Sequence, residues 1–131
     1  MLNYLREASQ IAKKSKDNLR NYILGCIGIR EDGAIVSSIN GAARFSKSVD
    51  DFYKLPNSHA EGRVLRKLGR NGIMFVARVH KKDGTLAMAL PCSMCQTRIK
   101  AFKVKKVYFT CNEEQYGIWS VKEDQFRFYD F

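Results

Sequence analysis

The sequence predicts an α/β fold, a three-layer sandwich in which a mixed sheet of about five strands carries helices on both faces. The chain has 131 residues, of which 45% are hydrophobic, which is enough for one compact core. Helical periodicity and strand-like apolar runs alternate in the order helix, strand, strand, helix, strand, helix, strand. Asp-Gly and Asn-Gly turns separate several of these runs. We therefore expect a single domain over residues 1–131.

The first half of the chain predicts one helix, two strands and a long loop. A helix is expected over residues 3–20, because apolar side chains recur there near 3.6-residue spacing. These side chains are Leu5, Ala8, Ile11, Ala12 and Leu19. Apolar strands are expected over residues 22–29 and 34–39. The loop at 41–57 is long, and long loops in compact domains are often functional.

The second half predicts two more helices with strands around them. The expected elements are a helix from residue 57 or 58 to 67 or 68, a strand at 73–80, an extended segment at 86–90, a helix at 91–102, and strands at 107–111 and 117–121. Residues 73–80 are expected to form a central strand. The buried stripe of the first of these helices is expected to hold Ala60, Val64, Leu65 and Leu68.

Charge and composition limit the partners and the compartment. The net charge is +10, from 23 basic and 13 acidic residues, which favours a polyanionic partner or a phosphate-bearing substrate. A solvated basic surface is the plain alternative. No apolar run approaches the length of a membrane span, and the start of the chain is too polar for a secretory signal. We therefore expect a cytoplasmic protein without a membrane partner.

Four cysteines stand at positions 26, 92, 95 and 111. An even number of cysteines in a small secreted chain would indicate disulfides, but the missing secretory signal favours reduced thiols. Cys26 and Cys111 lie in apolar runs and are expected to be buried.

Two short motifs, separated along the chain, predict a zinc site. His59-Ala60-Glu61 is followed by Pro91-Cys92-Ser93-Met94-Cys95, with thirty-two residues between His59 and Cys92. Zinc favours thiolate and imidazole ligands, and a catalytic zinc keeps one of its four positions open for water. His59, Cys92 and Cys95 supply three ligands. Glu61 is then placed to move protons between that water and a substrate.

The two motifs together resemble the zinc-dependent cytidine/deoxycytidylate deaminase superfamily, whose signature joins H-x-E to P-C-x-x-C. The resemblance covers about residues 20–110. It implies a cytidine deaminase-like sandwich with Zn²⁺ as cofactor, His59, Cys92 and Cys95 as zinc ligands, and Glu61 as the catalytic proton shuttle. The hairpin-like insertion before Pro91 departs from the plainest members and is closer to small phage- or bacterial-type deaminases.

The implied reaction is hydrolytic deamination of a nucleobase, with cytosine in a nucleoside or nucleotide as the favoured substrate. Asn40 follows the second strand, where the family commonly places a polar residue that touches substrate; an ordinary Asn-Gly turn is the alternative. Phe45 and Tyr53 in the long loop are candidates for stacking on the base or for packing beneath the loop. Ala60, between His59 and Glu61, is the fourth candidate for substrate contact.

Other interpretations stay open at this point. Ser58 and Glu61 also match a helix capping box, S-x-x-E. Cys92 and Cys95 also suit a redox pair at a helix start, although a redox protein would have no use for His59 or Glu61. A structural-zinc, nucleic-acid-binding module is a non-enzyme alternative. It would need a fourth ligand, and Cys111 and His80 lack a recognisable ligand spacing.

The identity of the substrate and the state of assembly are also open. Basic residues on three expected helices favour cytosine or adenine deamination within single-stranded DNA or RNA as a second function, if all three flank the zinc cleft. The aromatic tail after residue 112 offers rings that stack on bases or, more commonly, pack on one another. The sequence is compatible with homo-oligomers.

Overall fold

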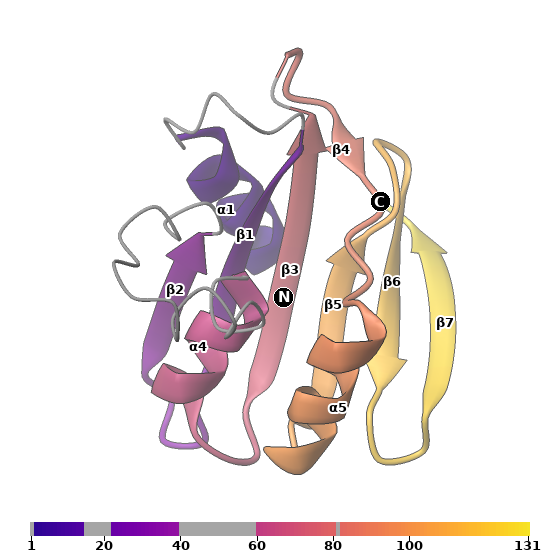
Figure 1. Cartoon of the computed structure of the whole chain (residues 1–131). Coiled ribbons are helices and arrows are strands. Elements are labelled where there is room, and N and C mark those ends of the chain that lie inside the picture. Colours follow the sequence, from indigo (N-terminus) through magenta and orange to yellow (C-terminus); the bar gives the residue numbers. More distant parts are fainter. Residues whose placement is uncertain (1, 15–21, 40–59, 81) are drawn as a thin grey trace.

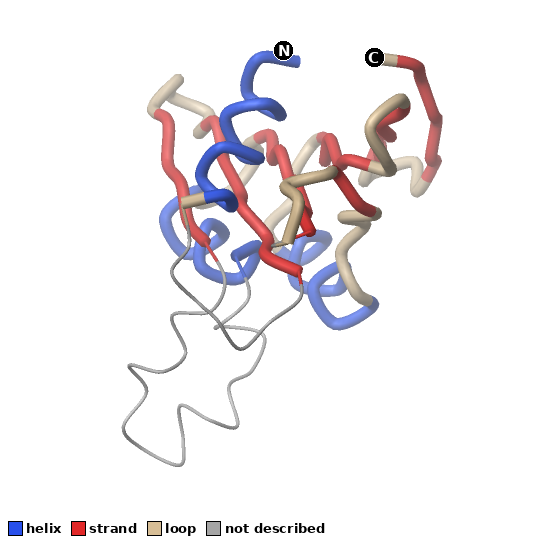
Figure 2. The backbone as a smooth tube through the Cα atoms, turned by 90° about the horizontal axis from the view of Figure 1, so that it is seen from above, coloured by secondary structure: helices blue, strands red, loops and turns tan. Residues whose placement is uncertain are grey.

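Seven strands form one mixed sheet in a computed structural model that describes residues 2–14, 22–39, 60–80 and 82–131 (Figure 1). The elements are α1 (Leu2–Lys13), β1 (Tyr22–Ile29), β2 (Ile35–Ile39), α4 (Ala60–Leu68), β3 (Ile73–His80), β4 (Leu86–Ala87), α5 (Ser93–Ala101), β5 (Lys106–Thr110), β6 (Gln115–Ser120) and β7 (Gln125–Asp130). Helix α1 covers one face of the sheet, and α4 and α5 cover the other (Figure 2). The three-layer α/β sandwich is confirmed, with more strands than the expected five.

The strand order is β2-β1-β3-β5-β6-β7, and β4 pairs with β3 off this path. Among the described strands, only β3 and β5 are parallel, which makes the sheet mixed. The β3 strand changes its neighbour along its length. Residues 73–76 pair with β5, and Arg78 and Val79 pair with β4. β4 thus pairs with the edge of β3 beyond the end of β5.

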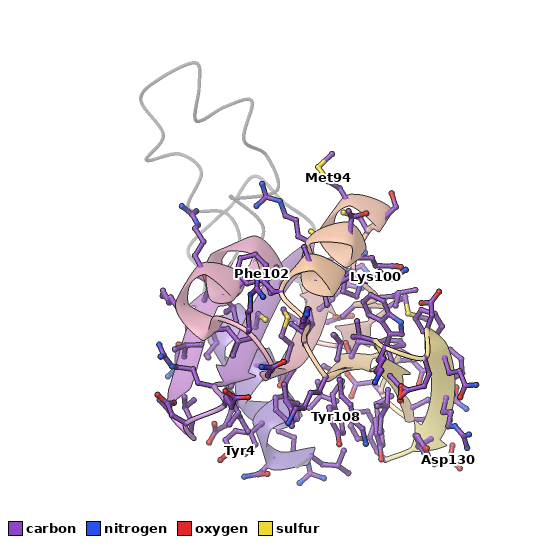
Figure 3. All side chains as sticks on the ribbon, turned by 90° about the horizontal axis from the view of Figure 1, so that it is seen from below. Tyr4, Met94, Lys100, Phe102, Tyr108 and Asp130 are labelled. Atoms are coloured by element: carbon purple, nitrogen blue, oxygen red, sulfur yellow. The ribbon has the colours of Figure 1, made fainter. Side chains whose placement is uncertain are left out.

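Side chains of β3 alternate between two cores. Met74 and Val76 face α4 and α5, and Phe75 and Ala77 face α1; all four are fully buried. A strand covered on both faces is apolar along its length, which is why residues 73–80 were expected to be central. In Figure 3, Tyr4 and Tyr108 lie on the α1 side, and Phe102 and Lys100 lie on the α5 side.

Helix α1 lies directly on β1. Leu5, Ala8 and Ala12 are buried on it, as the sequence predicted, and the glycine at position 25 of β1 lies beneath them. A Cβ atom at residue 25 would collide with the carbonyl oxygen of Ala8 and lie 2.9 Å from the amide nitrogen of Ala12. The absence of a side chain at Gly25 therefore lets the two backbones approach each other.

Replacing Gly25 by alanine is expected to lower the free energy of unfolding by about 3 kcal/mol, the upper end of the range for overpacked cores. The clash is with helix backbone, which cannot rotate away. Gly28→Ala is the matched control, because its Cβ would meet only the side-chain tips of Val64, Leu68 and Val36. The control should cost about 1 kcal/mol. Urea unfolding of both variants checks this, and equal losses would contradict the backbone clash.

Three expected elements differ from the structure. The first helix ends at Lys13 and not at residue 20; residues 15–21, with Leu19, lie outside the described ranges. Only Leu86 and Ala87 of the segment 86–90 pair as a strand, because the chain then leaves β3 to reach α5. The tail forms a full strand, β7, whose six residues are all exposed. Polar and aromatic residues alternate over only 125–128, and none of the β7 side chains is buried, so the pattern is short and marks no core face.

Helices long and apolar enough to cross a bilayer are not found within the described residues.

Candidate active site

The predicted cysteine pair lies at the start of α5. Cys92 is the N-cap residue, with extended backbone (φ −64°, ψ 166°), and its side chain makes no capping hydrogen bond. Cys95 follows within the first turn and is completely buried, whereas Cys92 is exposed. The two thiols therefore stand three residues apart at one helix end, one anchored in the core and one open to solvent. Pro91 was expected to open the helix. It instead precedes the N-cap.

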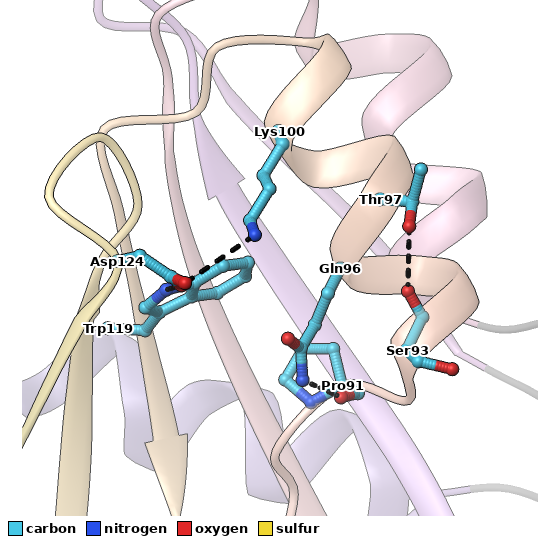
Figure 4. A network of polar contacts seen from close by, with 7 residues as sticks. All are labelled: Pro91, Ser93, Gln96, Thr97, Lys100, Trp119 and Asp124. Atoms are coloured by element: carbon cyan, nitrogen blue, oxygen red, sulfur yellow. Dashed lines mark hydrogen bonds and ion pairs between the residues drawn. The ribbon is translucent and has the colours of Figure 1, made fainter.

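Hydrogen bonds hold this helix start in place (Figure 4). The side-chain amide of Gln96 donates to the carbonyl oxygen of Pro91 at 2.7 Å, and the Thr97 hydroxyl donates to that of Ser93 at 3.0 Å. Gln96 was not among the predicted site residues. Its position four residues after Cys92 could have identified it, because a side chain on a helix points back toward the preceding turn.

The far end of α5 is tied to the hairpin of β6 and β7. The Lys100 ammonium lies 3.7 Å from an Asp124 carboxylate oxygen, and the other oxygen accepts a hydrogen bond from Trp119 Nε1 at 3.0 Å (Figure 4). Lys100 also stands 5.9 Å from the centre of the Trp119 ring, within range of a cation–π contact. Helix α5 is therefore held at both ends.

The second motif lies at the start of α4, beside α5 on the same face of the sheet (Figure 1). The helix begins at Ala60, so Glu61 is in its first turn. Buried Val64, Leu65 and Leu68 fix the rotation of α4, as predicted. The helices lead into β3 and β5, which are parallel neighbours, so their first turns lie at the same end of the sheet.

Several predicted site residues lie outside the described ranges: His59, Asn40, Phe45 and Tyr53. The side chains of Ala60 and Glu61 are likewise not described. Within the described part of the chain, no three His, Cys, Asp or Glu residues gather into a group that would hold a metal. The structure thus brings Cys92 and Cys95 together and places the helix start that carries Glu61 on their side of the sheet.

Neither proposed fourth ligand joins the cysteine pair among the described residues. Cys111 packs against the core on the α5 side, and burial raises the pKa of its thiol, so it keeps its proton at neutral pH. His80 instead lines a cavity beside α1 with Lys13 and Asp83. This placement counts against Cys111 and His80 as fourth ligands of the cysteine pair. Cys26 is fully buried, as expected.

The donor set at the start of α5 fits zinc. Two thiolates are soft ligands that zinc prefers, and the free N–H groups of a helix N-terminus stabilise negative charge on them. The first turn of α5 contains no acidic residue that would oppose this. Cys92 and Cys95 would therefore hold the ion from α5, and the third donor would come from the segment just before Ala60.

The basic residues do not all surround this site. Helix α1, which ends at Lys13, covers the opposite face of the sheet (Figure 2). Arg66 and Lys67 are in the last turn of α4, and Arg98 and Lys100 are in that of α5. Cys92 precedes α5, so Arg98 and Lys100 follow it by six and eight residues, about 9 and 12 Å along the helix axis. The idea that three basic helices flank one cleft is therefore wrong for α1.

The aromatic residues of the tail stack mainly on one another. Trp119 is fully buried and stacks on Phe126 at 5.6 Å between ring centres, and Tyr116 stacks on Tyr129 at 5.5 Å. Phe109 extends over Gly117, which has no side chain, and meets the edge of the Phe128 ring at 6.0 Å. Packing across β6 and β7 therefore accounts for these rings.

Comparison with known proteins decides the family. The family model described as "Cytidine and deoxycytidylate deaminase zinc-binding region" matches residues 2–111, which is most of the chain. The chain belongs to this family. Solved cytidine deaminases share the fold of this deaminase-family chain at low sequence identity. A search of curated protein sequences found no match.

Two of these structures are from mycobacteria. The cytidine deaminase from Mycobacterium leprae is 16% identical with a TM-score of 0.53, and 92% of each chain is covered. A mutant cytidine deaminase from Mycobacterium tuberculosis is also 16% identical, with a TM-score of 0.50 and 83% of each chain covered. At this identity they support the cytidine deaminase-like fold and do not establish the substrate of this family member.

Proposed function

We propose that this chain is a zinc-dependent deaminase that converts cytosine to uracil in a nucleoside or nucleotide. One observation carries the proposal. Cys92 and Cys95 occupy the start of α5, on the same face and at the same end of the sheet as the start of α4, in a chain of the deaminase family. His59, the residue just before α4, is the proposed third ligand.

The proposed roles follow from the chemistry of these side chains. A zinc ion held by three ligands would lower the pKa of a water molecule and so supply a nucleophile at neutral pH. Glu61 takes a proton from that water and delivers it to the departing amino group, which leaves as ammonia. The N–H groups at the start of α5 stabilise the negative charge on the ligands. Asn40, Phe45, Tyr53 and Ala60 remain the candidates for contact with the nucleoside.

The placement of charge favours a small substrate. A single-stranded polymer would need several phosphate contacts around the site, but α1 with Lys13 covers the opposite face of the sheet, and Arg66, Lys67 and Lys100 lie in the last turns of α4 and α5. Deamination of cytosine or adenine within single-stranded DNA or RNA remains the second candidate, because the net charge of +10 favours polyanions. We propose soluble, cytoplasmic action on the small substrate.

Ammonia release tests the proposal directly. The zinc-loaded protein is offered cytidine, deoxycytidylate, and single-stranded DNA and RNA that contain cytosine. We expect turnover of a nucleoside or nucleotide and none of the polymers, with chelator-treated protein as the background. Binding of a mononucleotide should change little with salt, because it presents one phosphate group. Turnover of a polymer, with a log–log salt slope near −0.7 per contacted phosphate, would overturn the preference.

A further inference from the structure

Thr110 lies where β3 exchanges one neighbouring strand for another. It is the last residue of β5 and is only 1% exposed, one of two buried polar residues among those described. From Ile73 to Val76, β3 pairs with β5. From Arg78 onwards, it pairs with β4. The segment 86–90 begins with β4 and leads into Pro91 and Cys92. Thr110 therefore lies between β3 and the segment 86–90, which precedes Cys92.

Hydrogen bonds from Thr110 join the two sides. Its hydroxyl accepts from the backbone amide of Arg78 at 3.2 Å and donates to the carbonyl oxygen of Ala87 at 2.7 Å. Its own carbonyl oxygen accepts from the amide of Ala89 at 2.8 Å. The hydroxyl thus acts as both donor and acceptor, which valine, of nearly the same shape, cannot do.

Two neighbouring side chains support the same segment. A carboxylate oxygen of Glu113, just after β5, accepts from the amide of Leu86 at 2.6 Å. The guanidinium of Arg78 donates to the carbonyl oxygen of Met88 at 3.4 Å. Each residue from Leu86 to Ala89 therefore has a backbone group bonded to β3 or to the end of β5.

Packing contributes less to holding this segment. Ala89 and Pro91 are buried, but the side chains of Met88 and Leu90 are 47% and 38% exposed. Ala89 is three residues from Cys92, at most about 10 Å of extended chain. Because exposed side chains do not fix the path of the chain, the hydrogen bonds at Thr110, together with the bond from Gln96 to Pro91, set where Cys92 begins α5.

We propose that Thr110 is a positioning residue for the metal centre, acting through the segment 86–90 on Cys92, with Glu113 in support. This rests on the proposed function, in which Cys92 and Cys95 hold zinc. The proposal also gives the insertion before Pro91 a role, because Thr110 hydrogen-bonds to its second half, the segment 86–90. Partners that orient metal ligands typically change metal affinity by 10- to 100-fold when they are removed.

The test compares Thr110→Val, Thr110→Ser and two control variants. We expect zinc to dissociate about 10- to 100-fold faster from Thr110→Val, measured with a chromophoric chelator well below the unfolding midpoint. Thr110→Ser keeps the hydroxyl and should stay close to wild type. The cobalt-substituted Thr110→Val protein should show shifted visible bands, because its ligand geometry changes.

The controls separate positioning from stability. Ser9→Ala removes another buried hydroxyl that donates to a backbone carbonyl, on α1 across the sheet, and should not change zinc release. Val107→Ala truncates a fully buried side chain, so it should lower the unfolding midpoint without accelerating zinc release. If Thr110→Val fails to fold, Glu113→Ala at an exposed position removes the acceptor of the Leu86 amide and should accelerate release less strongly. Wild-type release rates in both Thr110→Val and Glu113→Ala would overturn the proposal, and so would acceleration in Val107→Ala equal to that in Thr110→Val.

Hydrogen exchange distinguishes this inference from the proposed function. In zinc-free protein, amides of residues 86–92 should exchange faster in Thr110→Val than in Thr110→Ser. If wild type binds no zinc, the proposed function fails and the metal-positioning role fails with it, whatever the exchange shows. If wild type binds zinc and Thr110→Val shows neither faster exchange nor faster release, only the role of Thr110 fails.

Discussion

Replacing Glu61 by glutamine is expected to lower turnover by about a hundredfold or more, with zinc content and stability near wild type. Glutamine has the shape and hydrogen-bonding reach of glutamate, and it also serves in a helix capping box. It cannot carry a proton at neutral pH, and general acid–base catalysis typically contributes 10²- to 10⁴-fold. Turnover with cytidine or deoxycytidylate, metal content and the unfolding midpoint are measured on the same preparation.

This experiment also separates catalysis from capping by Ser58 and Glu61. Glu114→Gln, at an exposed position before β6, is the matched control and should leave turnover, zinc and stability unchanged. If Glu61→Gln keeps wild-type turnover, Glu61 is not the proton shuttle, and a capping role, which glutamine also fills, accounts for it. Loss of turnover with zinc retained supports the proton shuttle.

Cys92→Ala is expected to bring zinc content from about one ion per chain to almost none, and turnover with it. Two protein ligands are too few for a stable zinc site, whose catalytic form uses three. Cys92 suits this test better than Cys95 because it is exposed, so its truncation leaves no cavity in the core. Metal analysis by mass spectrometry after removal of loosely bound ions gives the content.

Cys111→Ala is the matched control for the loss of a thiol. Cys111 is half-buried and protonated, and nothing places it with the pair on α5, so this variant should keep its zinc. Zinc loss in Cys111→Ala would make that residue a fourth ligand and favour a structural site. Wild-type protein that folds but binds no added zinc would contradict the site altogether.

Much of the fold could be predicted because its central strands are buried on both faces. The predicted bounds 22–29 and 73–80 agree with β1 and β3, whose apolar runs end at polar or glycine-rich turns. Helix α4 was predicted to end at Lys67 or Leu68, and it ends at Leu68, where its apolar stripe ends and Gly69 follows with positive φ. β7 was missed because neither of its faces is buried.

The parts of the site that depend on residues close together in the sequence could be predicted. The spacing of Cys92 and Cys95 already placed both residues at one helix start. What the sequence could not show depends on contacts distant along the chain. Thr110 meets Ala87 only because β4 pairs with β3 beyond the end of β5, and no periodic pattern around Thr110 predicts that. The separation of Lys13 from α4 and α5 likewise depends on α1 covering the other face of the sheet.

The contact between α5 and the C-terminal hairpin gives the protein an optical reporter of its own. Trp119 is the single tryptophan of the chain, so its fluorescence needs no assignment. Its indole is fully buried, bonded to Asp124 and close to the Lys100 charge on α5. Since Lys100 belongs to the helix that begins with the cysteine pair, a shift of α5 changes the electric field at the indole and hence its emission maximum. The emission maximum of Trp119 can therefore report movement of α5 in unlabelled protein as metal or nucleoside is added.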